Sequence, residues 1–169
     1  MARGDERSSA RLGAVQALYQ MELTEKPVTD VMAEFEAHWL GRQVEDGDVQ
    51  PTEAAFFRNI LSGVLDEQTV IDRTIDAALA KTWPLARLEA VLRAILRAGC
   101  YELLRRLDVP VRVIIKEYVD IAGSFYADDE PGMVNAVLDD TSSWMLRVWL
   151  VRGWENPAGT FAHDHPSLG

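Results

Sequence analysis

Apolar residues recur at three- and four-residue spacing through most of the chain, which is the pattern of amphipathic helices. Residues 84–104 are apolar over most of a helical circumference, as expected of a helix buried on several sides. Pro84 suits a first helical position, because its missing N–H would have no partner there. Gly99 costs roughly 1 kcal/mol of helix propensity, and we expect it to let another helix come close. These features predict a central buried helix.

The same periodicity and the start and stop residues predict six further helices, which pack around the central one. They cover residues 10–23, 30–40, 52–64, 67–81, 111–125 and 131–151. The boundary between the third and fourth is either a turn or a kink near Asp66. Pro110 ends the central helix region, since the residue before a proline avoids the helical conformation. No segment alternates like a strand, so the predicted fold class is all-α.

The two ends of the chain differ from this helical pattern. Residues 1–9 are polar and are predicted to be a flexible basic arm that carries Arg3 and Arg7. Residues 152–169 hold two prolines and several polar residues, and they are predicted to be a disordered tail. Residues 10–151 then form one helical domain, as the length of 169 residues permits.

Composition limits what the domain is expected to bind. The net charge is -10, so any RNA or DNA site must be a local basic patch, because phosphate contacts need Lys and Arg. The single cysteine, Cys100, excludes a disulfide framework and a Cys-type zinc site within one chain. No apolar run approaches the ~20 residues that span a membrane, and the start has no signal-peptide pattern. We expect a soluble cytoplasmic protein.

Catalytic patterns are not found in the sequence. It has no glycine-rich phosphate loop, no Gly-x-Ser-x-Gly turn and no His-Glu-x-x-His pair. His163 and His165 fall in the predicted tail, which cannot hold a metal or a base in fixed geometry. We therefore expect a helical binding domain with no enzymatic activity, no cofactor and no metal.

Four sequence blocks resemble the NusB family of bacterial transcription antitermination factors. Residues 10–19 (ARLGAVQALY) resemble the family's first helix, and residues 94–104 (AILRAGCYELL) resemble its central helix. The block that begins with DVP at residues 108–110 and the block MVNAVLD at residues 133–139 follow in the family's order and spacing. The resemblance covers residues 10–139.

The resemblance implies about seven helices in two small bundles around the central helix. It also implies a non-enzymatic role in which the protein binds the boxA element of nascent ribosomal RNA. The expected partners are the small-subunit ribosomal protein NusE and the RNA polymerase elongation complex. The alternative is a NusB-like scaffold that binds proteins without specific RNA binding, which Asp5 and Glu6 favour because they dilute the basic start. A homodimer that hides the RNA surface is a further assembly left open.

Six residues match the family's RNA-binding positions. They are Arg3, Arg7, Arg11, Tyr19, Phe125 and Asp129. Arginines ahead of a helix grip phosphates, and aromatic rings stack on bases. Surface charge is the alternative role for Arg11, and core packing is the alternative for Phe125. Asp129 either accepts a hydrogen bond from a base amino group or caps the last helix.

The resemblance places the ribosomal-protein partner at Tyr19, Arg93 and Arg97. The two arginines lie one turn apart on a charged strip that we expect to be exposed. Plain surface charge is the alternative for both. The segment after Asp140 departs from the family and contains Trp144, Trp149 and Trp154. An altered reading frame or a lineage-specific tail would explain it; in the second case Trp144, Leu146 and Trp149 extend the apolar face of the last helix.

Overall fold

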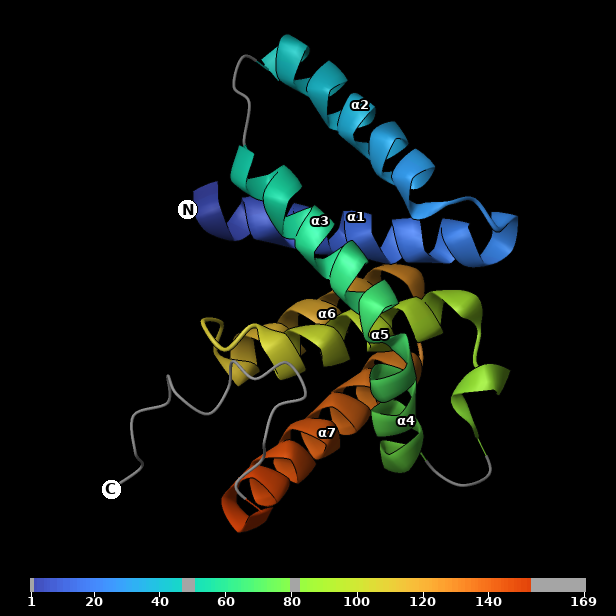
Figure 1. Cartoon of the computed structure of the whole chain (residues 1–169), viewed down its shortest axis with the longest axis vertical. Coiled ribbons are helices and arrows are strands. Elements are labelled where there is room, and N and C mark those ends of the chain that lie inside the picture. The colour runs from blue at the N-terminus through green and yellow to red at the C-terminus, as the bar shows by residue number, and fades with distance from the viewer. Residues whose placement is uncertain (1, 47–50, 80–82, 153–169) are drawn as a thin grey trace.

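The structure is a computed structural model that describes residues 2–46, 51–79 and 83–152 (Figure 1). These residues form α1 (Ala2–Thr24), α2 (Val28–Asp46), α3 (Pro51–Asp66), α4 (Gln68–Ala78), the 3-10 turn η1 (Leu85–Arg87), α5 (Ala90–Arg105), α6 (Val111–Phe125) and α7 (Glu130–Arg152). No strand occurs in these three segments, which confirms the all-α prediction. None of the helices there is long and apolar enough to cross a membrane.

The helices form two groups that share α5. Helices α1, α2 and α3 pack together, and α4, α6 and α7 pack with α5 below them in Figure 1. Helix α5 also contacts α1 and α3, so it joins the two groups. Ten of its residues are buried, from Leu92 to Leu103, because it meets neighbours on several sides. The predicted central buried helix is therefore confirmed.

The start of α5 was predicted too early. Pro84 precedes the short turn η1, and α5 begins only at Ala90. The Leu85 N–H donates to Asp76 Oδ1 at 2.8 Å, and the Arg93 guanidinium donates to the Leu85 carbonyl at 3.2 Å. Side chains therefore satisfy backbone groups that an α-helix would otherwise pair internally.

Other boundaries also differ from the prediction. Helix α1 begins at Ala2, so residues 2–9 are helical and do not form a separate arm. Ser8 lies inside α1, and its Oγ donates to Glu117 of α6. A turn at Glu67 separates α3 from α4, which settles the question of a kink. The predicted tail lies outside the described residues from 153 onward.

The C-terminal half of α7 does not extend the buried face in the way that the pattern suggested. Trp144 and Leu146 are exposed. The side chain of Trp149 and all of Trp154 lie outside the described residues.

Two glycines permit close helix packing. A Cβ added at Gly99 would lie 2.9 Å from Leu138 Cδ1, so the prediction that Gly99 admits another helix is confirmed for α7. A Cβ at Gly63 of α3 would lie 2.2 Å from Tyr101 Cζ, a contact that the sequence did not reveal. The Tyr101 hydroxyl donates to Asn59 Oδ1 at 3.1 Å, which holds the ring over Gly63.

We expect Gly63→Ala to lower the free energy of unfolding by about 1–3 kcal/mol, because the new methyl group forces Tyr101 out of place. Gly123→Ala is the matched control, since nothing lies within 4 Å of its added Cβ and alanine favours the helix. Urea unfolding of both variants measures the difference. Equal stabilities would show that Tyr101 moves aside at little cost.

Candidate nucleic-acid interface

Arg11 lies inside the protein and does not reach the surface. Its side chain is 2% exposed, and it meets the fully buried carboxylate of Glu102 on α5. Arg11 Nε donates to Glu102 Oε2 at 2.7 Å, and Nη2 donates to Oε1 at 3.0 Å. This is the bidentate geometry of a strong charge-assisted pair. The prediction that Arg11 grips RNA is therefore wrong, and so is its alternative as a solvated surface arginine.

Tyr118 of α6 completes the buried cluster. Its hydroxyl donates to Glu102 Oε2, and the side chain is fully buried. Burial, together with the neighbouring Glu102, raises the pKa of Tyr118 well above its ordinary value. Burial lowers the pKa of Arg11, but the hydrogen bond and charge of Glu102 outweigh it, so this pKa is raised. Arg11 remains positive and Tyr118 remains neutral throughout the physiological range.

A second carboxylate extends this cluster toward the surface. Glu117 of α6 is partly exposed and lies 3.8 Å from Arg11 Nη1. It also accepts hydrogen bonds from Ser8 Oγ at 2.9 and 2.8 Å. Residues 8–11 of α1 are therefore fixed on α5 and α6 together.

Three arginines surround the ring of Phe56 on α3. The guanidinium carbons of Arg7, Arg11 and Arg106 lie 4.7, 5.0 and 4.9 Å from its centroid. These are cation–π distances. The Arg7 side chain is 33% exposed, so Arg7 is the predicted RNA-binding arginine that reaches solvent. Arg3 lies in α1, and its side chain is outside the described residues.

Two exposed aromatic residues lie at the C-terminal ends of α1 and α6. Tyr19 and Phe125 are both exposed, so core packing is excluded for Phe125. Tyr126, next in the chain, donates to Glu89 Oε2 at 2.8 Å and lies near enough to Tyr19 to interact electrostatically. Ser8 precedes Tyr19 on α1 and contacts Glu117, which precedes Tyr126, so α1 and α6 run in the same direction along this surface.

Asp129 stands directly before α7 and is exposed. Its backbone carbonyl accepts a hydrogen bond from the Met133 N–H at 3.0 Å. A carboxylate at this place is favoured by the positive end of the helix dipole. This position fits the helix-start role predicted for Asp129 and leaves the carboxylate accessible.

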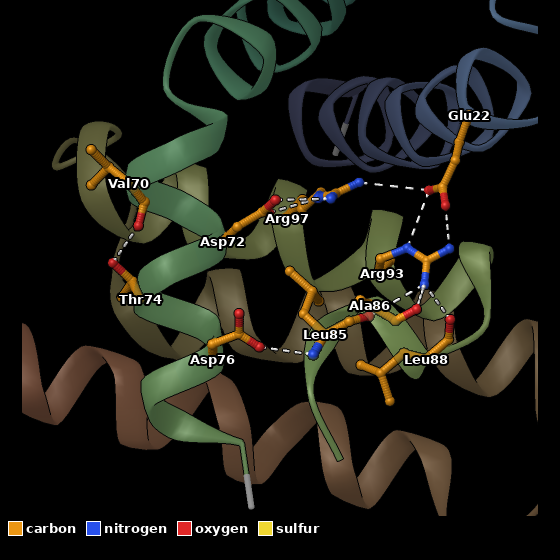
Figure 2. Close-up of polar contacts among 10 residues, drawn as sticks. All are labelled: Glu22, Val70, Asp72, Thr74, Asp76, Leu85, Ala86, Leu88, Arg93 and Arg97. Atoms are coloured by element: carbon orange, nitrogen blue, oxygen red, sulfur yellow. Dashed lines mark hydrogen bonds and ion pairs between the residues drawn. The ribbon is translucent and has the colours of Figure 1, made fainter. Parts of the chain in front are cut away.

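Arg93 and Arg97 do not form an exposed strip. Their side chains are 13% and 16% exposed. Figure 2 shows Arg93 between Glu22 of α1 and backbone carbonyls of residues 85–88. Arg97 binds both oxygens of Asp72 on α4, at 2.8 and 2.9 Å, and lies 3.6 Å from Glu22. The two arginines therefore join α1, α4 and α5, and the expectation of an exposed charged strip is wrong.

The sequence reading missed the acidic partners in these clusters. Glu102 was the strongest available signal, because it is a carboxylate within the most apolar stretch of the chain and buried charges are normally paired. Glu22 and Asp72 carried no such signal, since they lie in ordinary amphipathic helices.

The chain matches known proteins over most of its length. The NusB family model matches residues 8–143. The chain belongs to the NusB family. Transcription antitermination protein NusB of Bradyrhizobium sp. (strain ORS 278) is 58% identical over 137 residues, which are 81% of this chain and 82% of that protein. The protein of the same name from Rhodopseudomonas palustris (strain HaA2) is 55% identical over 151 residues, 89% of each chain.

Solved structures of the NusB family share the fold. The structure of T. maritima NusB has a TM-score of 0.70 and 28% identity, and the match covers 81% of this chain and 90% of that one. NusB in a structure of antitermination factors NusB and NusE with double-stranded RNA has a TM-score of 0.68 and 22% identity, covering 85% and 99%. These matches confirm the predicted family and its two-bundle helical fold.

In this NusB-family chain, we expect Arg11→Met to lower the free energy of unfolding by about 3–5 kcal/mol, because Glu102 is left charged and buried without its partner. The triple change Arg11→Met, Glu102→Leu and Tyr118→Phe replaces the whole cluster with apolar side chains. It is expected to recover most of the loss. Urea unfolding checks both, and an unchanged stability of the single variant would contradict the buried pair.

The pKa of Tyr126 gives a prediction on pH dependence. Partial burial and the hydrogen bond to Glu89 raise it to about 12, against an ordinary value of about 10. The folded state holds the Tyr126 hydroxyl proton more tightly than the unfolded state does. The resulting contribution to the free energy of unfolding is present below about pH 10 and is lost as pH rises through about 12. The part of the tyrosinate absorbance that is lost in Tyr126→Phe belongs to Tyr126. In the wild type this part should titrate with a midpoint near pH 12. Glu89→Gln should move it toward about 10, and a midpoint unaffected by Glu89→Gln would refute the contact.

Proposed function

We propose that this chain is a non-enzymatic transcription antitermination factor that binds boxA RNA together with ribosomal protein NusE. Family membership supports the role, since its relatives carry the name transcription antitermination protein. The observation that carries RNA binding is the surface along α1 and α6, with Arg7 near one end and the exposed rings of Tyr19 and Phe125 at the other. The role places the protein in the cytoplasm with the RNA polymerase elongation complex.

The RNA strand lies along this surface in the proposed complex. Arg7 and Tyr19 are twelve residues apart on α1, about 18 Å at 1.5 Å per residue, which suits a short single-stranded segment. Arg7 contacts the backbone phosphates, and Tyr19 and Phe125 stack on bases, as in other single-strand readers. The exposed carboxylate of Asp129 accepts from a base amino group. Arg3 adds a second cation at the start of α1.

The surface proposed to bind NusE is formed around Arg93 and Arg97 of α5. Arg93 and Arg97 are largely committed to Glu22 and Asp72, so they shape the surface and their remaining exposed atoms contact NusE. Tyr19 is exposed on α1, one turn before the Glu22 that binds these arginines, and it contacts both RNA and NusE in this arrangement.

A protein-binding scaffold without specific RNA binding is the second candidate. Two observations favour it. Arg11 is buried, and Arg7 lies 3.7 Å from Asp108, so fewer cations are free for phosphate than the resemblance implied. A scaffold would capture NusE and show no preference for boxA.

Fluorescence anisotropy of labelled boxA and of a scrambled RNA, with and without NusE, separates the two candidates. We expect selective boxA binding that tightens when NusE is added. Tyr19→Ala and Phe125→Ala should each cost about 1–3 kcal/mol of RNA binding, which is roughly 5- to 150-fold in Kd. Trp144→Ala, an exposed aromatic change in the C-terminal half of α7, is the control and should change little.

Equal binding of the two RNAs, with NusE still captured, would replace the antitermination proposal with the scaffold. Selective binding that Tyr19→Ala and Phe125→Ala leave unchanged would retain the role and remove these residues from the interface. Size-exclusion chromatography of the free protein shows in addition whether a homodimer covers the surface before RNA is added.

A further inference from the structure

Arg106 follows α5 directly and shares the ring of Phe56 with Arg7. Its backbone N–H donates to the Glu102 carbonyl at 2.8 Å and closes the last turn of α5. Its side chain is 23% exposed. It contacts the same solvent-exposed carboxylate as Arg7, that of Asp108. The sequence patterns discussed above gave Arg106 no role.

The arginines around Phe56 differ in their carboxylate partners. Arg11 is matched by Glu102 inside the protein and also lies 3.8 Å from Glu117. Arg7 and Arg106 both approach one oxygen, Asp108 Oδ2, at 3.7 and 3.0 Å. These two guanidinium groups therefore share a single carboxylate that is half exposed, and neither has that carboxylate to itself.

The Arg106 side chain is also incompletely bonded. Its Nε is buried and has no hydrogen-bond partner among the described residues. Its Nη1 reaches Asn59 Oδ1 only at 3.5 Å. The buried Nε is therefore not reachable by an anion from solvent, but the side chain is 23% exposed and its Nη1 has only the 3.5 Å contact, so an anion that offers oxygens to the Nη groups improves their hydrogen bonding. Two neighbouring N–H groups of a guanidinium can donate in parallel to two oxygens of one phosphate.

Arg105, which precedes Arg106 in the chain, is more completely hydrogen-bonded. Arg105 donates from Nε to both oxygens of Glu67, at 2.8 Å each, and this pair ties α5 to the turn before α4. Arg105 is therefore committed to holding the fold together. Arg106 has no comparable bidentate partner among the described residues.

We propose that Arg106 and Arg7 together bind one phosphate of the RNA backbone, with Phe56 as the platform beneath them and Asp108 as the group that the phosphate displaces. Phe56 is buried and fixed in α3, so the two guanidinium groups are held close before RNA arrives. This inference rests on the proposed RNA-binding function and adds Arg106, which directly follows α5, to the arginines of α1.

The test is the salt dependence of RNA binding by Arg106→Gln, measured in the full chain with NusE over a series of potassium chloride concentrations. We expect Kd to rise about 3- to 10-fold at low salt, and the slope of log affinity against log salt to become shallower by about 0.7, one phosphate contact on a single strand. Arg106→Lys should keep the slope and lose part of the affinity. Asp108→Asn should tighten binding, because the competing carboxylate is gone.

Arg73→Gln is the matched control. Arg73 is exposed on α4, which carries none of the proposed RNA contacts, and no ion pair joins it to another described residue, so this change removes the same charge outside the proposed site. Circular dichroism melts of every variant show whether the fold is kept. A slope that Arg106→Gln leaves unchanged, or that Arg73→Gln alters equally, would overturn the two-arginine site.

Failure of the proposed function gives a different result. The wild-type protein would then bind boxA and scrambled RNA equally. Backbone phosphates are common to both RNAs, so the Arg106→Gln slope on either one still decides whether Arg106 contacts phosphate.

Discussion

The buried ion pair between Arg11 and Glu102 is the interaction on which the arrangement of helices depends. Removing two charges from water is costly, and the pair is stable because two hydrogen bonds at 2.7 and 3.0 Å and the Tyr118 hydroxyl satisfy the carboxylate. These three residues come from α1, α5 and α6. The pair therefore sets how α1 lies on the rest of the protein, and with it the position of every surface residue that α1 carries.

Six arginines on or next to α1 and α5 divide into two sets by what they contact. Arg11, Arg93, Arg97 and Arg105 are bonded to carboxylates that join one helix to another. Arg7 and Arg106 are more exposed and share one carboxylate. In a chain with a net charge of -10, this division means that four arginines are committed to carboxylates within the fold, while Arg7 and Arg106 keep exposed N–H groups for RNA phosphate.

Sequence periodicity was sufficient to predict the helices, the central buried helix and the role of Gly99, because these depend on local spacing. The ordered sequence blocks were sufficient for the family. Burial of Arg11 could not be predicted in this way, since its partner lies 91 residues away and periodicity reveals the face of a helix but not its neighbour. The late start of α5 has a similar cause, because Asp76 and Arg93 bind the backbone that would otherwise continue the helix.

The most direct test of this division is the salt dependence of boxA binding, with NusE present, by the triple variant Arg11→Met, Glu102→Leu and Tyr118→Phe. This variant removes the Arg11 charge together with its buried partners. We expect the slope of log affinity against log salt to equal that of the wild type, because Arg11 contacts Glu102 and not phosphate. A slope shallower by about 0.7, in a variant that keeps its helical fold, would contradict the structural role of Arg11 and return it to the RNA-binding surface.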